Sequence, residues 1–342
     1  MDLAYRRENL RLAAPFTISR ETTVEEEVLW VEIRHDDVSG FGEATPQAHY
    51  AESVDSAAAF LDQAEGLLGH DPFALEAIGR RLAEIPGEMA AKAAIDAALY
   101  DLCGKLTDLP VYRLLGLDRA GPPTSWTVWL GSPDDMARRA DVADDGRFRR
   151  LKLKLGGRDG LDVERVRAVR SVTELPLMVD VNEYWTLDEA VDAIVELEGL
   201  GVEYVEQPLL AGDPDGPGLK RRSRLPIYVD EDCHTLADVA ACAERAHGVN
   251  IKLAKSGGIR EAVRMAIAAR ALGLGVMLGC MVESGLAISA GAQIASLCDH
   301  VDLDGNLLLA EDPWPGVPFD EGVQLPPDAA GLGVHEAVPD PR

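Results

Sequence analysis

From about residue 124 onward, short runs of apolar and β-branched residues alternate with longer stretches whose apolar positions recur at helical spacing. The runs are TSWTVWL, RRLKLKL, LPLMVDVN, VEYVEQPL, LPIYVDED, GVNIKLAK, GVMLGCM and HVDLDG. Their polar ends fall 21 to 29 residues apart, at Lys154, Asp180, Glu206, Asp230, Lys252, Met281 and Asp302. Because each interval leaves room for a helix, the pattern predicts repeated βα units and a parallel sheet. Eight such runs without a glycine-rich dinucleotide fingerprint favour a closed barrel over an open sheet.

The first 120 residues have a different pattern, typical of an α+β domain. The stretch VLWVEIRHDDVSGFGEA contains two strand-like runs and a hairpin signal around Asp37–Gly40. Helical patterns follow at 51–68 and 72–84, and EMAAKAAIDAALYDLCGKL predicts a well-buried helix. Residues 121–311 hold the predicted barrel. Residues 312–342 are rich in Pro and Gly, and we expect them to leave the barrel and pack back on the first domain.

Composition narrows the class of protein. The chain has 342 residues, 47% of them hydrophobic, with 33 Lys and Arg against 59 Asp and Glu, a net charge of −26. Such a charge repels nucleic acids. No apolar run is long enough to span a bilayer, and no apolar stretch follows the early arginines, so we expect a cytoplasmic protein without membrane contact. Five scattered cysteines without a CxxC pair predict neither a disulfide framework nor a zinc site.

Three carboxylates end successive predicted strands. Asp180, Glu206 and Asp230 close the runs PLMVD, VEYVE and PIYVD, and the carboxyl ends of barrel strands meet at one mouth. Buried charges that converge there repel one another unless a cation lies between them. Hard oxygen ligands suit Mg²⁺, with Mn²⁺ as the second choice. The alternative is that each carboxylate caps the next helix or meets an arginine.

Lysines form the second chemical feature. Lys152 and Lys154 are two apart in LKLKL, so both side chains point to one face of the strand. Their mutual repulsion, together with a metal charge, should lower the amine pKa values towards those of a general base. In NIKLAKSGG, Lys252 is the better partner across the barrel, because Lys255 lies past the strand. The alternative is a solvated lysine on an edge strand.

Two further groups end the last predicted strands. Asp302 and Asp304 in VDLDGN share a face by the same spacing, and such a pair suits a substrate ammonium group. The alternative for Asp304 is a simple Asp-Gly turn. Glu283 ends the seventh run and is predicted to line the pocket, although a role in packing is the competing interpretation.

Taken in order and spacing, these motifs give the chain a resemblance over nearly its whole length to the enolase superfamily, in its muconate-lactonising subgroup. The motifs are GFGEATP, LKLKLGG, VDVN, VEQP, VDED, NIKLAKSGG, CMVES and VDLDG. The resemblance implies a (β/α)7β barrel and an N-terminal α+β capping domain that the C-terminal segment completes. It also implies that Asp180, Glu206 and Asp230 are the metal ligands and that Lys154 and Lys252 are the acid/base lysines. Lys152 would hold a substrate carboxylate, and Asn182 and Glu231 would lie behind the metal ligands.

The eighth-strand D-x-D motif is similar to that of dipeptide epimerases, where it holds the α-ammonium of the dipeptide. Asp302 and Asp304 would take that role. The resemblance therefore implies Mg²⁺-assisted 1,1-proton transfer that inverts the α-carbon next to the C-terminal carboxylate. The expected partner is a dipeptide, and a homo-oligomer is left open.

Alternatives within this fold are a muconate-type cycloisomerase and an enzyme like o-succinylbenzoate synthase or N-acylamino acid racemase, which need no ammonium site. A Schiff-base aldolase would need one lysine but not three carboxylates, and a non-catalytic binder would not need the intact set of charges. The substrate side chain is open as well. Arg20 in the capping loop would suit an acidic side chain, whereas the acidic run Glu25–Glu27 would suit a basic one.

Overall fold

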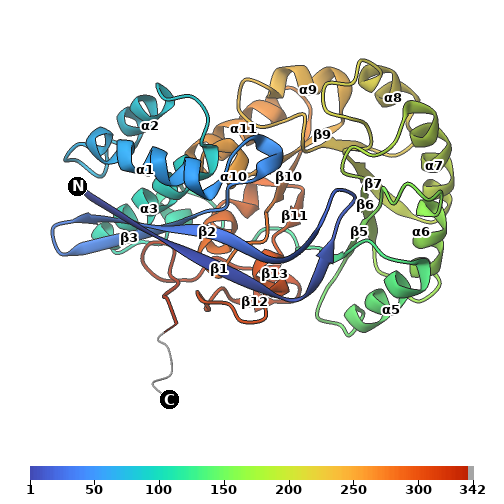
Figure 1. Cartoon of the computed structure of the whole chain (residues 1–342), viewed down its shortest axis with the longest axis horizontal. Helices are drawn as coiled ribbons and strands as arrows, with labels where there is room; N and C mark the ends of the chain where they lie inside the picture. Colours follow the sequence, from blue (N-terminus) through green and yellow to red (C-terminus); the bar gives the residue numbers. More distant parts are fainter. Residues whose placement is uncertain (338–342) are drawn as a thin grey trace.

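The computed structural model describes residues 1–337, so positions 338–342 of the predicted C-terminal segment lie outside the described residues. Within residues 1–337, parallel strands follow one another in chain order, from β4 to β11, in an eight-stranded sheet. A bridge between Thr124 and Val301 brings the first and last strands together, with Ser125 N donating to Val301 O at 3.0 Å. The sheet therefore closes into a barrel (Figure 1), which confirms the predicted fold class.

The barrel strands end close to the polar residues that marked them in the sequence. They are β4 (Trp126–Val128), β5 (Leu151–Lys154), β6 (Leu177–Asp180), β7 (Val202–Glu206), β8 (Ile227–Val229), β9 (Gly248–Lys252), β10 (Gly275–Gly279) and β11 (His300–Asp302). On β5, Leu151 and Leu153 belong to the apolar cluster that contains Met136 and Val166 of the surrounding helices. Lys152 and Lys154, which alternate with these leucines, consequently face the barrel interior.

Helices form the outer layer of the barrel (Figure 1). They are α5 (Pro133–Ala143), α6 (Asp162–Arg170), α7 (Leu187–Gly199), α8 (Gly216–Arg222), α9 (Val239–Arg245), the short α10 (Leu253–Ser256), α11 (Ile259–Ala271) and α12 (Gly285–Ala292). Local sequence fixes several starts. Ser132 caps α5, Thr186 and Glu189 form a capping box on α7, and Ser284 caps α12.

The N-terminal part joins an antiparallel sheet to a helical layer. Its strands are β1 (Asp2–Thr17), β2 (Thr22–His35) and β3 (Val38–Ala44), and its helices are α1 (Val54–Leu68), α2 (Leu75–Ala83), α3 (Met89–Thr107) and α4 (Val111–Leu114). The first three helices agree with the predicted ranges to within a few residues. β1 is not among the predicted elements, because the charged sequence RRENLR interrupts its apolar alternation.

The predicted hairpin turn is wrong by a few residues. The turn occupies Asp36 and Asp37, since His35 pairs with Val38, and Gly40 lies inside β3. A Cβ atom on Gly40 would lie 2.1 Å from Ala98 O and 2.5 Å from Leu102 N of α3. Glycine is therefore present for close packing of strand and helix rather than for a turn.

The C-terminal residues contact both the barrel and the N-terminal part. The short strands β12 (Phe319–Asp320) and β13 (Val323–Gln324) lie against the barrel, where Gln324 Nε2 donates to Leu303 O at 3.1 Å and the Phe319 and Phe148 rings meet at 5.5 Å. Leu332 N donates to Asp101 Oδ1 of α3 at 2.7 Å, and the Trp314 ring meets the Trp30 ring edge-on at 5.5 Å. The contacts of Trp314 and Leu332 support our proposed division into a capping unit (1–120 with 312–342) and a barrel (121–311), whereas β12 and β13 do not pack on the first domain as expected. No helix among the described residues is long and apolar enough to cross a membrane.

The close packing at Gly40 gives a test of the capping unit. Gly40→Ala should lower the free energy of unfolding by roughly 1–3 kcal/mol, because the new methyl group meets backbone atoms that cannot rotate away. Gly66→Ala is the matched control, since a Cβ atom there meets nothing within 4 Å and α1 gains a better helix former. Urea denaturation followed by circular dichroism measures both. Equal midpoints for the two variants would contradict the packing argument.

Candidate functional site

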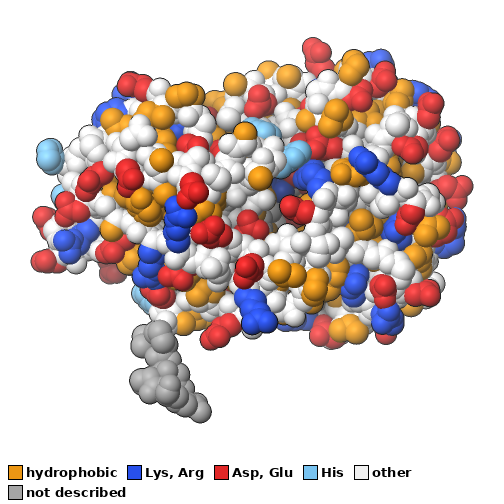
Figure 2. Space-filling view, in the orientation of Figure 1, with side chains coloured by type: hydrophobic (Ala, Val, Ile, Leu, Met, Phe, Trp, Pro, Cys, Tyr) orange, Lys and Arg blue, Asp and Glu red, His pale blue; other side chains and the backbone are white. Residues whose placement is uncertain are grey.

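A pocket opens between the barrel mouth and the capping unit, lined by residues of both. Strand-end residues of the barrel form its floor, and the hairpin that joins β1 to β2 and the segment 47–50 form the opposite wall. Figure 2 shows the corresponding recess near the centre of the face, bordered by histidine, basic and acidic side chains.

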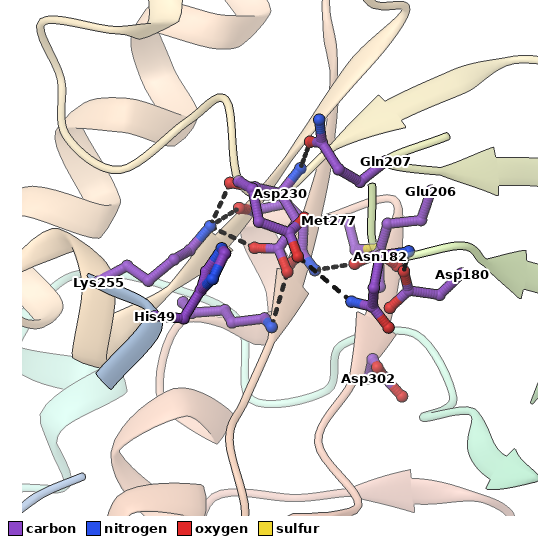
Figure 3. Close-up of polar contacts among 12 residues, drawn as sticks. His49, Asp180, Asn182, Glu206, Gln207, Asp230, Lys255, Met277 and Asp302 are labelled. Carbon is purple, nitrogen blue, oxygen red and sulfur yellow. Dashed lines mark hydrogen bonds and ion pairs between the residues drawn. The ribbon is translucent and has the colours of Figure 1, made fainter. Parts of the chain in front are cut away.

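The three predicted carboxylates meet directly beneath the residues that line this floor. Asp180 and Glu206 are register partners at the ends of β6 and β7, and Asp230 directly follows β8. All three are buried. Figure 3 shows them clustered where neighbouring strands end. Parallel strand order therefore brings together residues that are far apart in the sequence, as predicted.

Lysines neutralise these acids. Lys152 Nζ lies 2.8 Å from Glu206 Oε2, 3.2 Å from Asp180 Oδ2 and 2.8 Å from Asp302 Oδ2. Lys154 Nζ donates to Asp180 Oδ2 at 2.6 Å, and Lys252 Nζ lies 2.8 Å from Asp230 Oδ2. β5 and β9 are four places apart in the eight-stranded order, so Lys154 and Lys252 enter the mouth from opposite sides.

The pKa of Lys152 is raised, not lowered as expected from repulsion between the two amines of β5. Burial lowers the pKa of Lys152, but Asp302, Glu206 and Asp180 outweigh burial and raise it well above the usual value. Burial likewise lowers the pKa of Lys252, and Asp230 outweighs it. The sequence showed only the repulsion between amines, which lowers a lysine pKa. The attraction of the surrounding carboxylates has the larger effect on the pKa, because these groups lie within ion-pair distance.

The carboxylates fit a divalent cation. Glu206 Oε2 and Asp230 Oδ2 are buried and make no hydrogen bond in the described structure, although a lysine Nζ lies 2.8 Å from each. Burial and the Asp180 charge raise the pKa of Glu206, so the acids crowd one another despite the lysines. Hard oxygen atoms with spare lone pairs are the donors that such ions prefer.

Asn182 and Glu231 lie behind this group. Asn182 Nδ2 donates to Glu231 Oε1 at 3.3 Å, and its Oδ1 accepts from Lys154 at 3.4 Å. Burial and the Asp230 charge raise the pKa of Glu231 to about 7. The backbone is left-handed at Asn182, Glu183 and Gln207, with φ of 48°, 75° and 35°. Strained loops of this kind gather at functional sites.

Arg20 lines the pocket and is already paired with acids of the barrel. Its guanidinium lies 3.1 Å from Glu183 Oε2 and 3.0 Å from Glu231 Oε1. His49 completes this cluster, 3.1 Å from Glu183 Oε2. The ligand atoms of His49, Glu183 and Glu231 lie close enough together to hold a metal ion. The Arg20 guanidinium supplies positive charge to the two glutamates. The sequence analysis missed His49 and Glu183, and the one available signal was that Glu183 directly follows Asn182.

Asp302 and Asp304 lie together on the pocket floor beside Lys152. Asp302 Oδ1 accepts from Ser125 Oγ at 2.6 Å, and Asp304 Oδ2 accepts from Thr127 N at 2.7 Å. Burial and the Asp302 charge raise the pKa of Asp304 to about 7. A cation at this position would relieve the repulsion between the two acids.

Glu283 differs from expectation, whereas Lys255 lies past the strand and outside the pocket lining, in line with the preference for Lys252. Glu283 is buried and is not among the described residues that line the pocket, and burial and Glu43 raise its pKa to about 8. Lys255 is fully enclosed and donates to Asp230 Oδ1, Asp230 O and Cys233 O. Figure 3 shows Lys255 reaching Asp230 from outside the strand ends. It therefore holds a floor carboxylate in place without facing the pocket.

Comparison with known proteins identifies similar chains. Residues 1–116 match the family described as "Mandelate racemase / muconate lactonizing enzyme, N-terminal domain", and residues 135–337 match "Enolase C-terminal domain-like". An L-Ala-D/L-Glu epimerase from Bacteroides thetaiotaomicron is 40% identical, over 95% of this chain and 85% of its own length.

Two solved structures are also similar. A substrate-liganded complex of the L-Ala-D/L-Glu epimerase from Bacillus subtilis has a TM-score of 0.94 and 32% identity, and 99% of each chain is covered. The dipeptide epimerase from Enterococcus faecalis V583, complexed with Mg and L-Leu-L-Tyr, has a TM-score of 0.93 and 31% identity, with 97% and 98% covered.

Buried carboxyls near the pocket predict how stability depends on pH. The pKa values of Glu283 and Glu43 are raised to about 8 and about 7, against about 4.3 for an unfolded glutamate. As the pH falls from about 9 to about 6, the folded chain binds protons that the unfolded chain does not. With a chelator present, the thermal midpoint should therefore rise over this window. Calorimetry measures it, and Glu283→Gln should flatten the slope; a midpoint that falls would contradict the assignment.

Proposed function

The chain belongs to the mandelate racemase / muconate lactonizing enzyme family of the enolase superfamily, and from this membership we propose that it is a dipeptide epimerase. The reaction inverts the α-carbon next to the C-terminal carboxylate by moving a proton from one face to the other. The observation that carries the proposal is the placement of Lys154 and Lys252 on opposite sides of a pocket whose floor holds Asp302 and Asp304.

The two ends of a dipeptide match the charges of the floor. Lys152 is buried and cationic, so it would bind the substrate carboxylate. Asp302 and Asp304 are acidic neighbours that lack a second cation, so they would receive the α-ammonium group. A ligand held at both ends has its α-carbon fixed between them, which lowers the entropy cost of reaction.

Asp180, Glu206 and Asp230 would hold the divalent cation. We propose Mg²⁺, since the similar Enterococcus faecalis structure contains Mg, with Mn²⁺ as the second choice. When bound, the cation would stabilise the negative charge that grows on the substrate carboxylate as the α-proton leaves. Lys152 contributes positive charge to the same oxygens, and burial strengthens its effect.

The lysines perform the proton transfer. Lys154 Nζ, in its neutral form, takes the α-proton of one epimer, while the ammonium of Lys252 returns a proton to the opposite face. For the other epimer the roles reverse, so each turnover exchanges the protonation states of the two amines. Asn182 Oδ1 and Asp180 Oδ2 hold Lys154 Nζ, and Asp230 Oδ2 lies beside Lys252 Nζ. These contacts fix each amine on its own side.

The cycloisomerase and o-succinylbenzoate synthase alternatives share the cation and the lysines. They do not account for Asp304, which is buried beside Asp302 and is costly to ionise without a cationic ligand. The acidic pair therefore favours a substrate with an ammonium group.

Exchange in D₂O tests the proposed function directly. Incubating the protein with a library of L,L-dipeptides and Mg²⁺ should yield products one mass unit heavier that contain the D-epimer of the C-terminal residue. Mass spectrometry and chiral chromatography detect the two changes. A chelator should abolish both, and Mg²⁺ should restore them. Failure to label any dipeptide would contradict the proposal.

Single lysine variants test the two-base scheme. Lys252→Ala and Lys154→Ala should each slow epimerisation by roughly 10²–10⁴-fold, because one face loses its acid or base. Each should still label one epimer in D₂O without inverting it, and the two variants should retain opposite epimers. Lys220→Ala on α8, whose lysine donates to Ala243 O, serves as the control. Full epimerisation by Lys252→Ala would refute the scheme.

A further inference from the structure

The pocket divides into a reactive floor and a wall with a different composition. The lysines and acids of the floor all come from barrel strand ends, so any substrate side chain that extends away from them meets the capping unit. That wall contains the apolar side chains of Phe16 and Ile18 on the β1–β2 hairpin, together with Thr23, Glu26 and Gln47. Its charges therefore decide which side chain the pocket accepts.

The positive groups of the wall are already engaged. Arg20 is compensated by ion pairs with Glu183 and Glu231. His49 lies against Glu183, and burial and the Arg20 charge lower its pKa, so the imidazole is neutral at pH 7. An acidic substrate side chain would have to break these pairs and leave buried carboxylates without a partner.

Glu21 and Glu26 are the acidic groups of this wall, and Glu26 is the less exposed of the two. Glu26 Oε1 accepts from Gln47 Nε2 at 2.8 Å, and no basic group among residues 1–337 forms an ion pair with Glu26 within 4.0 Å. Burial raises the pKa of Glu26 to about 7, and the charges of Glu21 and Glu43 act in the same direction. The side chain is half-buried, whereas its neighbours Glu25 and Glu27 on β2 are exposed, as strand alternation requires.

We propose that Glu26 is a specificity residue that receives a cationic substrate side chain, so that the protein prefers dipeptides with lysine or arginine to those with glutamate. This inference rests on the proposed function. A lysine or arginine side chain fits the wall in two ways. Its methylene stem would lie against Phe16 and Ile18, and its charged end would compensate the buried carboxylate.

The test compares matched dipeptides. L-Ala-L-Lys has the neutral analogue L-Ala-L-norleucine, and L-Ala-L-Glu has the neutral analogue L-Ala-L-Gln; L-Lys-L-Ala reports on the other position. With the unaltered protein, kcat/KM should be at least about tenfold higher for L-Ala-L-Lys than for L-Ala-L-norleucine, as expected for a charged hydrogen bond. Glu26→Gln should bring the ratio of kcat/KM for L-Ala-L-Lys to that for L-Ala-L-norleucine close to one.

Glu25→Gln is the control variant, because it removes the same charge from the exposed face of the same strand. It should retain the full preference for lysine. The inference is overturned if L-Ala-L-Glu is the better substrate, or if Glu26→Gln and Glu25→Gln change the lysine-to-norleucine ratio equally.

The two proposals fail differently. Turnover of neutral dipeptides without discrimination by charge would overturn only the role of Glu26. Absence of α-proton exchange with every dipeptide, neutral ones included, would overturn the proposed function and the inference with it.

Discussion

The structure depends on charge compensation at one end of the barrel. Asp180, Glu206 and Asp230 are buried side by side because each βα unit places its strand next to the previous one. Burying three carboxylates is costly, so the barrel surrounds them with Lys152, Lys154, Lys252 and Lys255. Removing any one of these side chains leaves a buried charge without its ion-pair partner. The stability of each charged group in the floor therefore depends on the others.

The same constraint reaches the capping unit. Glu231 follows Asp230 directly and is also buried, and its counter-ion, Arg20, comes from the hairpin between β1 and β2. The hairpin is consequently held over the mouth by an ion pair to the floor. A second contact has the same effect at the far side, where Asp96 of α3 accepts from Arg260 N at the start of α11. The Arg20–Glu231 pair thus positions the hairpin through a charge that the barrel must neutralise, and the Asp96 contact adds a second anchor.

This arrangement separates chemistry from selectivity. The groups that would bind the ends of a substrate and move its proton lie on rigid strand ends, whereas the groups that would meet its side chain lie on a long antiparallel hairpin. The wall can therefore differ between relatives without disturbing the floor.

The sequence by itself determined the barrel, the order of its strands and the residues at their carboxyl ends, because apolar runs that mostly close on a charged residue are a local pattern. Only the tertiary structure decided what those charges do. The raised pKa of Lys152 depends on acids from other strands, Asp302 among them at a separation of 150 residues. The structure also moved the hairpin turn to Asp36–Asp37, paired Arg20 with Glu231, and turned Glu26 rather than Glu25 or Glu27 towards the pocket. The physical reason is the same in each case: packing between distant segments decides which side chains meet, and electrostatic energies depend on those distances.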